Sequence, residues 1–140
     1  MGTLASLKYF SATSNDVNKE IIDRGSAIKI AARQGHQGVV ELLLGQTNVE
    51  VDDALLGAAQ NNKIGLVKLV LGKDQVNVNY ANTDGNTALI LASENGHYEI
   101  VKMLLDTGKT DVNKKSKKGW TALLMAANNG HHDIVKLQRF

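Results

Sequence analysis

Apolar residues recur along the chain at a spacing that predicts pairs of short helices. In residues 87–108, Leu89 and Ala92 lie one helical turn apart and form a first stripe. A second stripe has the spacing i, i+1, i+4 and i+5: Ile100, Val101, Leu104 and Leu105. A glycine follows each stripe, Gly96 and then Gly108, and glycine ends helices because it adopts a left-handed backbone at little cost. We therefore expect two antiparallel helices in this segment.

The same arrangement repeats along the chain. The sequence DGNTAL at residues 84–89 returns as KGWTAL at 118–123, and NGH at 95–97 returns at 129–131, a shift of 34 residues. Weaker copies lie in phase upstream, and the third follows the second by only 27 residues, which predicts a short connection over 47–52. The chain is thus expected to form one domain, 1–140, of about five units: 1–24 as an N-terminal cap, 25–51, 52–80, 81–114 and 115–140.

A short polar residue precedes the first stripe of each complete copy. The side-chain oxygen of such a residue can accept a hydrogen bond from a free backbone N–H and so begin a helix. The four predicted helix caps are Ser26, Asp53, Thr87 and Thr121. Because a single helix pair cannot bury its own apolar stripe, neighbouring pairs must stack. The pattern therefore predicts an all-α, helix-turn-helix solenoid with atypical terminal repeats.

The fourth unit carries motifs that resemble the ankyrin repeat. They are Gly85-Asn86-Thr87-Ala88-Leu89-Ile90-Leu91-Ala92, then Gly96-His97, Ile100-Val101, Leu104-Leu105 and Asp111-Val112-Asn113. The resemblance covers residues 24–140, and the stretch 104–113 is similar to the arrays of large fungal ankyrin proteins. It implies an ankyrin-type solenoid whose function is non-catalytic protein binding through a concave groove. Two alternatives stay open: a substrate-selecting part of a larger enzyme or effector, and a structural spacer or oligomerisation array.

Three departures from the ankyrin pattern affect the expected stability. Alanine replaces the proline that follows each cap in the family pattern. The unfolded chain is then less restricted in conformation, so we expect each repeat to be less stable. The histidine of the family pattern is replaced at Lys29, Leu56, Ile90 and Leu124, so we expect no buried polar network between repeats. In the last helix Gln138-Arg139 stands where Leu-Leu is expected. This difference indicates either a solvated C-terminal cap or an array that continues.

Composition removes several classes of function. The chain has no cysteine, which excludes disulfides, thiol catalysis and cysteine-based zinc sites. Its net charge of +2 gives no general electrostatic attraction to nucleic acid. No apolar run approaches the roughly 20 residues of a membrane-spanning helix, and the N-terminus lacks the pattern of a signal peptide. We therefore expect a monomer in the cytoplasm whose partner is a protein or peptide, with no membrane contact.

The sequence offers no convincing catalytic, cofactor or metal site. His131 and His132 are adjacent, and adjacent residues on a helix diverge, whereas metal ligands must converge. No serine–histidine–aspartate set is visible, and the glycines recur with the repeat and not in a phosphate-binding loop. We expect no catalytic residue, no cofactor, no metal and no small-molecule ligand.

The run Lys114-Lys115-Ser116-Lys117-Lys118 is the one dense cluster of charge. It falls in the turn before Gly119, so the simpler interpretation is a solvated hairpin. A nuclear-import signal or a site for an anionic partner is the alternative.

Partner-binding positions follow from the resemblance, residue by residue. At the ends of the first helices they are Arg33, Gln34, Gln60, Asn61, Glu94, Asn95, Asn128 and Asn129, and at the turns Thr83, Asp84, Asn86, Lys117, Lys118 and Trp120. An exposed tryptophan is a frequent interface anchor. Trp120 either serves as such an anchor or folds over the neighbouring turn near Asn86.

Overall fold

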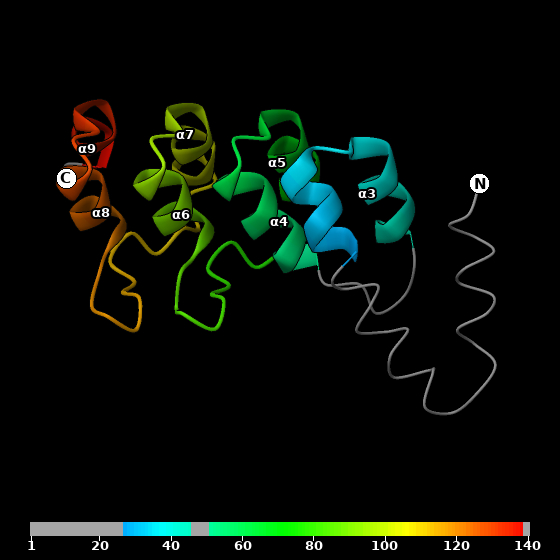
Figure 1. Cartoon of the computed structure of the whole chain (residues 1–140), viewed down its shortest axis with the longest axis horizontal. Helices are drawn as coiled ribbons and strands as arrows, with labels where there is room; N and C mark the ends of the chain where they lie inside the picture. Colours follow the sequence, from blue (N-terminus) through cyan, green and yellow to red (C-terminus); the bar gives the residue numbers. More distant parts are fainter. Residues whose placement is uncertain (1–26, 46–50, 139–140) are drawn as a thin grey trace.

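Helices in consecutive pairs make up the described part of the chain (Figure 1). The structure is a computed structural model that describes residues 27–45 and 51–138, and within them no strand occurs, only an isolated bridge between Ala81 and Thr87. Residues 27–34 are helical. The other helices are α3 (Gln37–Leu44), α4 (Val51–Gln60), α5 (Ile64–Leu71), α6 (Ala88–Glu94), α7 (Tyr98–Asp106), α8 (Ala122–Asn128) and α9 (His132–Gln138). The predicted all-α helix-turn-helix solenoid is confirmed.

The paired helices form two layers, with α4, α6 and α8 in one and α3, α5, α7 and α9 in the other (Figure 1). Each first helix packs on the next along the array, α4 on α6 and α6 on α8, and the second helices follow in the same order. Alanines allow this close approach, because Ala88, Ala92, Ala122 and Ala126 are buried. These small side chains thus act in stacking.

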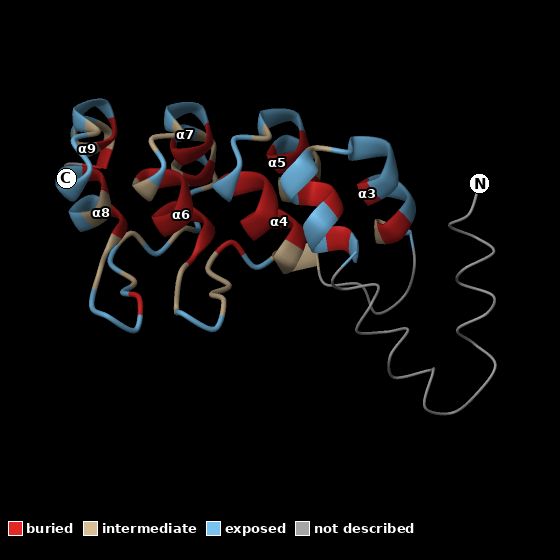
Figure 2. Ribbon diagram, viewed as in Figure 1, coloured by how far each residue is buried: buried red, intermediate tan, exposed pale blue. Residues whose placement is uncertain are grey.

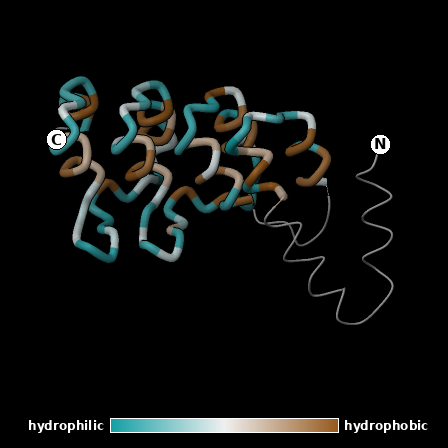
Figure 3. Tube along the Cα trace, viewed as in Figure 1, coloured by the Kyte–Doolittle hydropathy of each residue, from teal (hydrophilic) through white to brown (hydrophobic). Residues whose placement is uncertain are grey.

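The apolar core lies between the two layers of helices (Figure 2). In α7 the side chains of Ile100, Val101 and Leu104 are fully buried, as the second stripe predicts, whereas Leu105 is only half-buried. Figure 3 shows the same separation, with apolar residues between the layers and polar residues at the tips of the projecting turns. Burying this face is what stabilises helices that are too short to be stable alone.

Two of the four predicted helix caps are confirmed. The Thr87 hydroxyl accepts a hydrogen bond from the Ile90 N–H, and the Thr121 hydroxyl accepts one from the Leu124 N–H, both at 3.2 Å. The prediction for Asp53 is wrong, because α4 already begins at Val51 and Asp53 lies within its first turn. An acidic residue is favourable there because of the helix dipole. The expected start of the third unit at residue 52 therefore falls inside α4, and Ser26 lies outside the described residues.

The turns between paired helices use a left-handed residue, as the sequence predicts. Gly96 has a φ of +75°, and the equivalent position of the third unit is taken by Asn62 with a φ of 59°. Asparagine tolerates this conformation better than other residues with a Cβ. The shortened third unit therefore keeps the same turn without glycine.

Polar contacts link the repeats through the histidines of the Gly-His positions, one of them exposed and the other part-buried. His97 Nε2 lies 2.9 Å from the Gln60 carbonyl oxygen, and His131 Nε2 lies 3.0 Å from the Glu94 carbonyl oxygen. These rings satisfy carbonyls at the ends of α4 and α6, which lack partners within their own helices. The Gly-His positions thus supply contacts that we had assigned to another histidine.

The structure also corrects the expectation of a solvated C-terminal cap at Gln138, because this side chain is buried. It is only 5% exposed, and its Nε2 donates a hydrogen bond to Ser93 Oγ at 3.0 Å. Its Oε1 is buried and has no hydrogen-bond partner in the part of the chain that the structure describes. A polar pair therefore occupies the place where the family pattern has a leucine, and Arg139 lies outside the described residues.

Candidate binding groove

Two hairpin turns project from the helix layers, and we call residues 82–86 and 116–120 the fingers (Figure 1). In the first finger, Asn82 Oδ1 accepts hydrogen bonds from the backbone N–H groups of Asp84 and Asn86, at 2.9 and 3.0 Å. In the second, Ser116 Oγ accepts one from the Trp120 N–H at 3.1 Å. Sequence reasoning missed both organising residues. The available signal was a short polar residue three positions before a glycine, which is typical of a side-chain-closed turn.

The two fingers contact each other through their backbones. The Lys117 N–H donates a hydrogen bond to the Asp84 carbonyl at 3.0 Å. Gly85 has a φ of +78°, and a Cβ at this position would lie 2.8 Å from the Lys117 nitrogen. Glycine is therefore needed at residue 85 both for its conformation and for the close approach of the second finger. This contact fixes the position of the second finger relative to the first.

A pocket of about 570 Å³ opens between the fingers and the first helices α6 and α8. Its wall contains residues predicted to bind a partner: Asp84, Asn86, Glu94, Lys117, Lys118, Trp120, Asn128 and Asn129. Two further lining residues, Ser116 and Met125, were not predicted. The pocket thus brings together positions from two successive repeats that lie far apart in the sequence.

The remaining predicted positions do not line this pocket. Arg33, Gln34, Gln60 and Thr83 are exposed. Asn61 and Asn95 help to close the ends of their own helices. The Asn61 side-chain amide donates to the Gly57 carbonyl at 3.0 Å, and the Asn95 amide donates to the Leu91 carbonyl at 2.8 Å. Their amide donors are therefore partly occupied, which the sequence pattern did not reveal.

Trp120 is half-buried and lines the pocket together with Asn86. Neither of the two roles that the sequence proposed for it, an anchor or a cover of the neighbouring turn, is decided by this placement. The Asn86 Oδ1 atom is buried and has no hydrogen-bond partner among the described residues. The role of Trp120 as an anchor stays a prediction.

Charges of both signs line the pocket and stay unpaired with one another. Lys117 and Lys118 are exposed on the second finger, Asp84 lies at the tip of the first, and Glu94 is half-buried at the end of α6. Within the described residues these side chains make no ion pair. The second half of the lysine run, Lys117 and Lys118, therefore lies on the exposed finger. Lys114 precedes the finger and is half-buried, and its Nζ donates to the Asn79 carbonyl at 3.1 Å. Nuclear import through this run stays a prediction.

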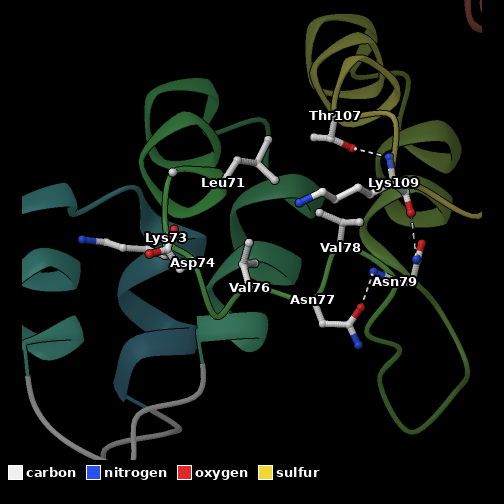
Figure 4. A pocket seen from close by; sticks show the side chains of 10 residues that line it. Leu71, Lys73, Asp74, Val76, Asn77, Val78, Asn79, Thr107 and Lys109 are labelled. Atoms are coloured by element: carbon white, nitrogen blue, oxygen red, sulfur yellow. Dashed lines mark hydrogen bonds between the residues drawn. The ribbon is translucent and has the colours of Figure 1, made fainter.

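A second pocket, of about 450 Å³, lies where α5 and α7 end (Figure 4). Lys109 extends across it towards Leu71, whereas Lys73 points away. Asn79 holds one side, because its Nδ2 donates to the Lys109 carbonyl at 3.0 Å and its Oδ1 accepts from the Asp111 N–H at 2.7 Å. This pocket contains none of the predicted binding residues, and its polar contacts tie one repeat to the next.

In the part of the chain that is described, no group of three potential metal ligands converges on one point. The pair His132 and Asp133 is exposed, with 3.6 Å between Nε2 and Oδ1. Among the same residues no helix is long and apolar enough to span a membrane.

A family model described as ankyrin repeats, in three copies, matches residues 28–116 and, in an overlapping match, residues 55–137. The two matches together include both fingers and both helices that line the pocket. No curated protein matches the chain.

Proposed function

The chain belongs to the ankyrin-repeat family, and from this premise we propose that it binds a protein or peptide in the pocket between its two fingers. Ankyrin repeats generally mediate protein–protein interactions and are typically non-catalytic. The proposal assigns this chain a binding role without catalysis, cofactor or metal. A monomer in the cytoplasm is part of the same proposal.

The observation that carries the proposal is the gathering of family binding positions around one pocket. Residues from the ends of α6 and α8 and from both fingers reach the same space of about 570 Å³. Fixed fingers favour binding, because a preformed site does not have to be ordered when the partner arrives. The hydrogen bond between Lys117 and Asp84 and the turn closed by Ser116 supply this order.

The chemistry of the finger end suggests which partner fits. Trp120 and Met125 offer apolar surface, and the exposed Lys117 and Lys118 lie beside it. An apolar side chain of the partner would rest on the tryptophan, and acidic neighbours would meet the lysines. Half-buried tryptophan gives large contact area at small entropic cost, which is why it dominates many interfaces.

The test begins with capture of partners from a lysate and identification of those that bind the purified chain. Trp120→Ala should then weaken the binding of a captured partner by about 2 kcal/mol, or roughly 30-fold. Replacing Lys117 and Lys118 by alanine should mainly slow association and reduce its dependence on salt. Titration calorimetry and stopped-flow measurements give the two quantities.

The control is Leu104→Ala, which removes a fully buried side chain from α7 without touching the pocket. It should unfold the chain, at a cost of about 2–5 kcal/mol. If Trp120→Ala instead lowers stability as Leu104→Ala does, while affinity per folded molecule is unchanged, the tryptophan is a packing residue and the site lies elsewhere. A spacer would bind nothing through this pocket, and a substrate-selecting part of an enzyme would bind its substrate there.

A further inference from the structure

We propose that the helix end of the pocket binds the cationic head of an arginine or lysine side chain, held by Glu94 and Asn128. This inference rests on the proposed function and names a second feature of the partner. It concerns the end of the pocket opposite to the lysine-bearing finger.

Glu94 carries its negative charge at a helix end where no described residue neutralises it. It is the last residue of α6 and is half-buried, and its carboxylate has no ion pair or hydrogen bond with the described residues. A helix C-terminus carries partial negative charge, so an anion is disfavoured there. The equivalent residues of the neighbouring units are neutral, Gln60 at the end of α4 and Asn128 at the end of α8. Glu94 therefore breaks a local rule that its neighbours obey, which is typical of residues kept for function.

The backbone of Glu94 is held in place while its side chain stays unpaired. Its carbonyl oxygen lies 2.9 Å from Asn129 Nδ2 and 3.0 Å from His131 Nε2. Both contacts come from the next repeat, so the end of α6 is fixed relative to α8. The carboxylate thus projects from a well-anchored position at the edge of the pocket.

Asn128 adds an acceptor next to this carboxylate. Its Nδ2 donates to Asn129 Oδ1 at 3.2 Å, and its own Oδ1 has no partner among the described residues. Glu94 and Asn128 both line the pocket. The unpaired oxygens of Glu94 and Asn128 are acceptors, and lysine and arginine are the side chains that carry only donors. A charged donor also satisfies the carboxylate more strongly than a neutral one.

The two ends of the pocket give the partner a direction. At the finger end Lys117 and Lys118 outnumber Asp84, so the net charge there repels a cation. Met125, in the middle of α8, can contact the apolar stem of a long side chain. The partner segment should therefore carry an acidic residue towards the finger and a basic residue towards Glu94. A partner with the opposite order would place like charges together at both ends.

The test uses N-acetyl-arginine amide as the probe and N-acetyl-citrulline amide as its neutral isostere. Each is titrated into the ¹⁵N-labelled chain, and amide chemical shifts are followed. The arginine derivative should shift the signals of Glu94, Asn128 and Asn129, with an affinity about tenfold higher than that of the citrulline derivative. Such a factor corresponds to about 1.4 kcal/mol.

Glu94→Gln should remove this difference between the two probes. Glu99→Gln is the matched control, because it removes the same charge from an exposed residue of α7 outside the pocket, and it should preserve the difference. Equal binding of both probes to the wild-type chain, or an arginine preference that survives Glu94→Gln, would overturn the inference.

The same variants separate this inference from the proposed function. A partner that loses affinity with Trp120→Ala but not with Glu94→Gln would overturn the cation site and leave the function standing. A partner unaffected by Trp120→Ala would overturn the function, while the arginine titration would still decide the cation site.

Discussion

Replacing Gly85 and Gly119 by alanine tests the contact between the two fingers. The two glycines are equivalent positions of successive repeats, and both have a positive φ, +78° and +86°. A Cβ on Gly85 would lie 2.8 Å from the Lys117 nitrogen and 3.1 Å from the Ser116 Cα, whereas a Cβ on Gly119 meets no described atom within 4 Å. The second variant therefore measures backbone strain alone, and the first measures strain plus the clash.

The magnitudes follow from these two terms. An alanine in the left-handed region costs about 1 kcal/mol in either variant. At residue 85 the second finger must also move, because the clash is with backbone. Overpacking of this kind costs about 1–3 kcal/mol. The structure therefore predicts losses in the free energy of unfolding of about 1 kcal/mol for Gly119→Ala and about 3 kcal/mol for Gly85→Ala.

Urea unfolding followed by far-UV circular dichroism measures both losses. The effect of alanine on the unfolded chain is the same in the two variants, so it cancels in their difference. A difference of about 2 kcal/mol corresponds to roughly 6 °C in the melting temperature for a chain of this size. Equal losses, within about 0.5 kcal/mol, would refute the close approach of the fingers. A gain in stability for Gly119→Ala would refute its left-handed conformation.

Four further variants test the helix ends and the buried polar pair, each by the same unfolding measurement. Ala88→Pro and Ala122→Pro should each raise the free energy of unfolding by about 0.5 kcal/mol, since both residues are the first of their helices; a clear loss would place them elsewhere. Ser93→Ala combined with Gln138→Leu should be neutral or stabilising, because both buried polar partners are removed together, and a loss above about 1 kcal/mol would show that the pair stabilises the fold. Glu94→Gln should gain about 0.3–1 kcal/mol at low salt and less at high salt, whereas a loss would reveal a stabilising contact of its carboxylate.

The local pattern of the chain was sufficient for the architecture. The apolar stripes and the threonines before α6 and α8 each act over a few neighbouring residues, and the 34-residue period repeats them along the chain. Each is found where the sequence predicts it. Asp53 failed as a cap because the third copy is shorter than the others, and periodicity could not show that α4 begins at Val51. The family resemblance also selected the positions that surround the pocket, although not their partner.

The contacts between repeats could be decided only by tertiary structure. The bonds of His131 to the Glu94 carbonyl and of Gln138 to Ser93 join residues 37 and 45 positions apart. Such pairs depend on the distance and rotation with which one helix pair stacks on the next, and a sequence pattern fixes neither. For the same reason, the sequence identified Glu94, Lys117 and Trp120 as separate candidates, and only the stacking of α8 on α6 brought them to one pocket.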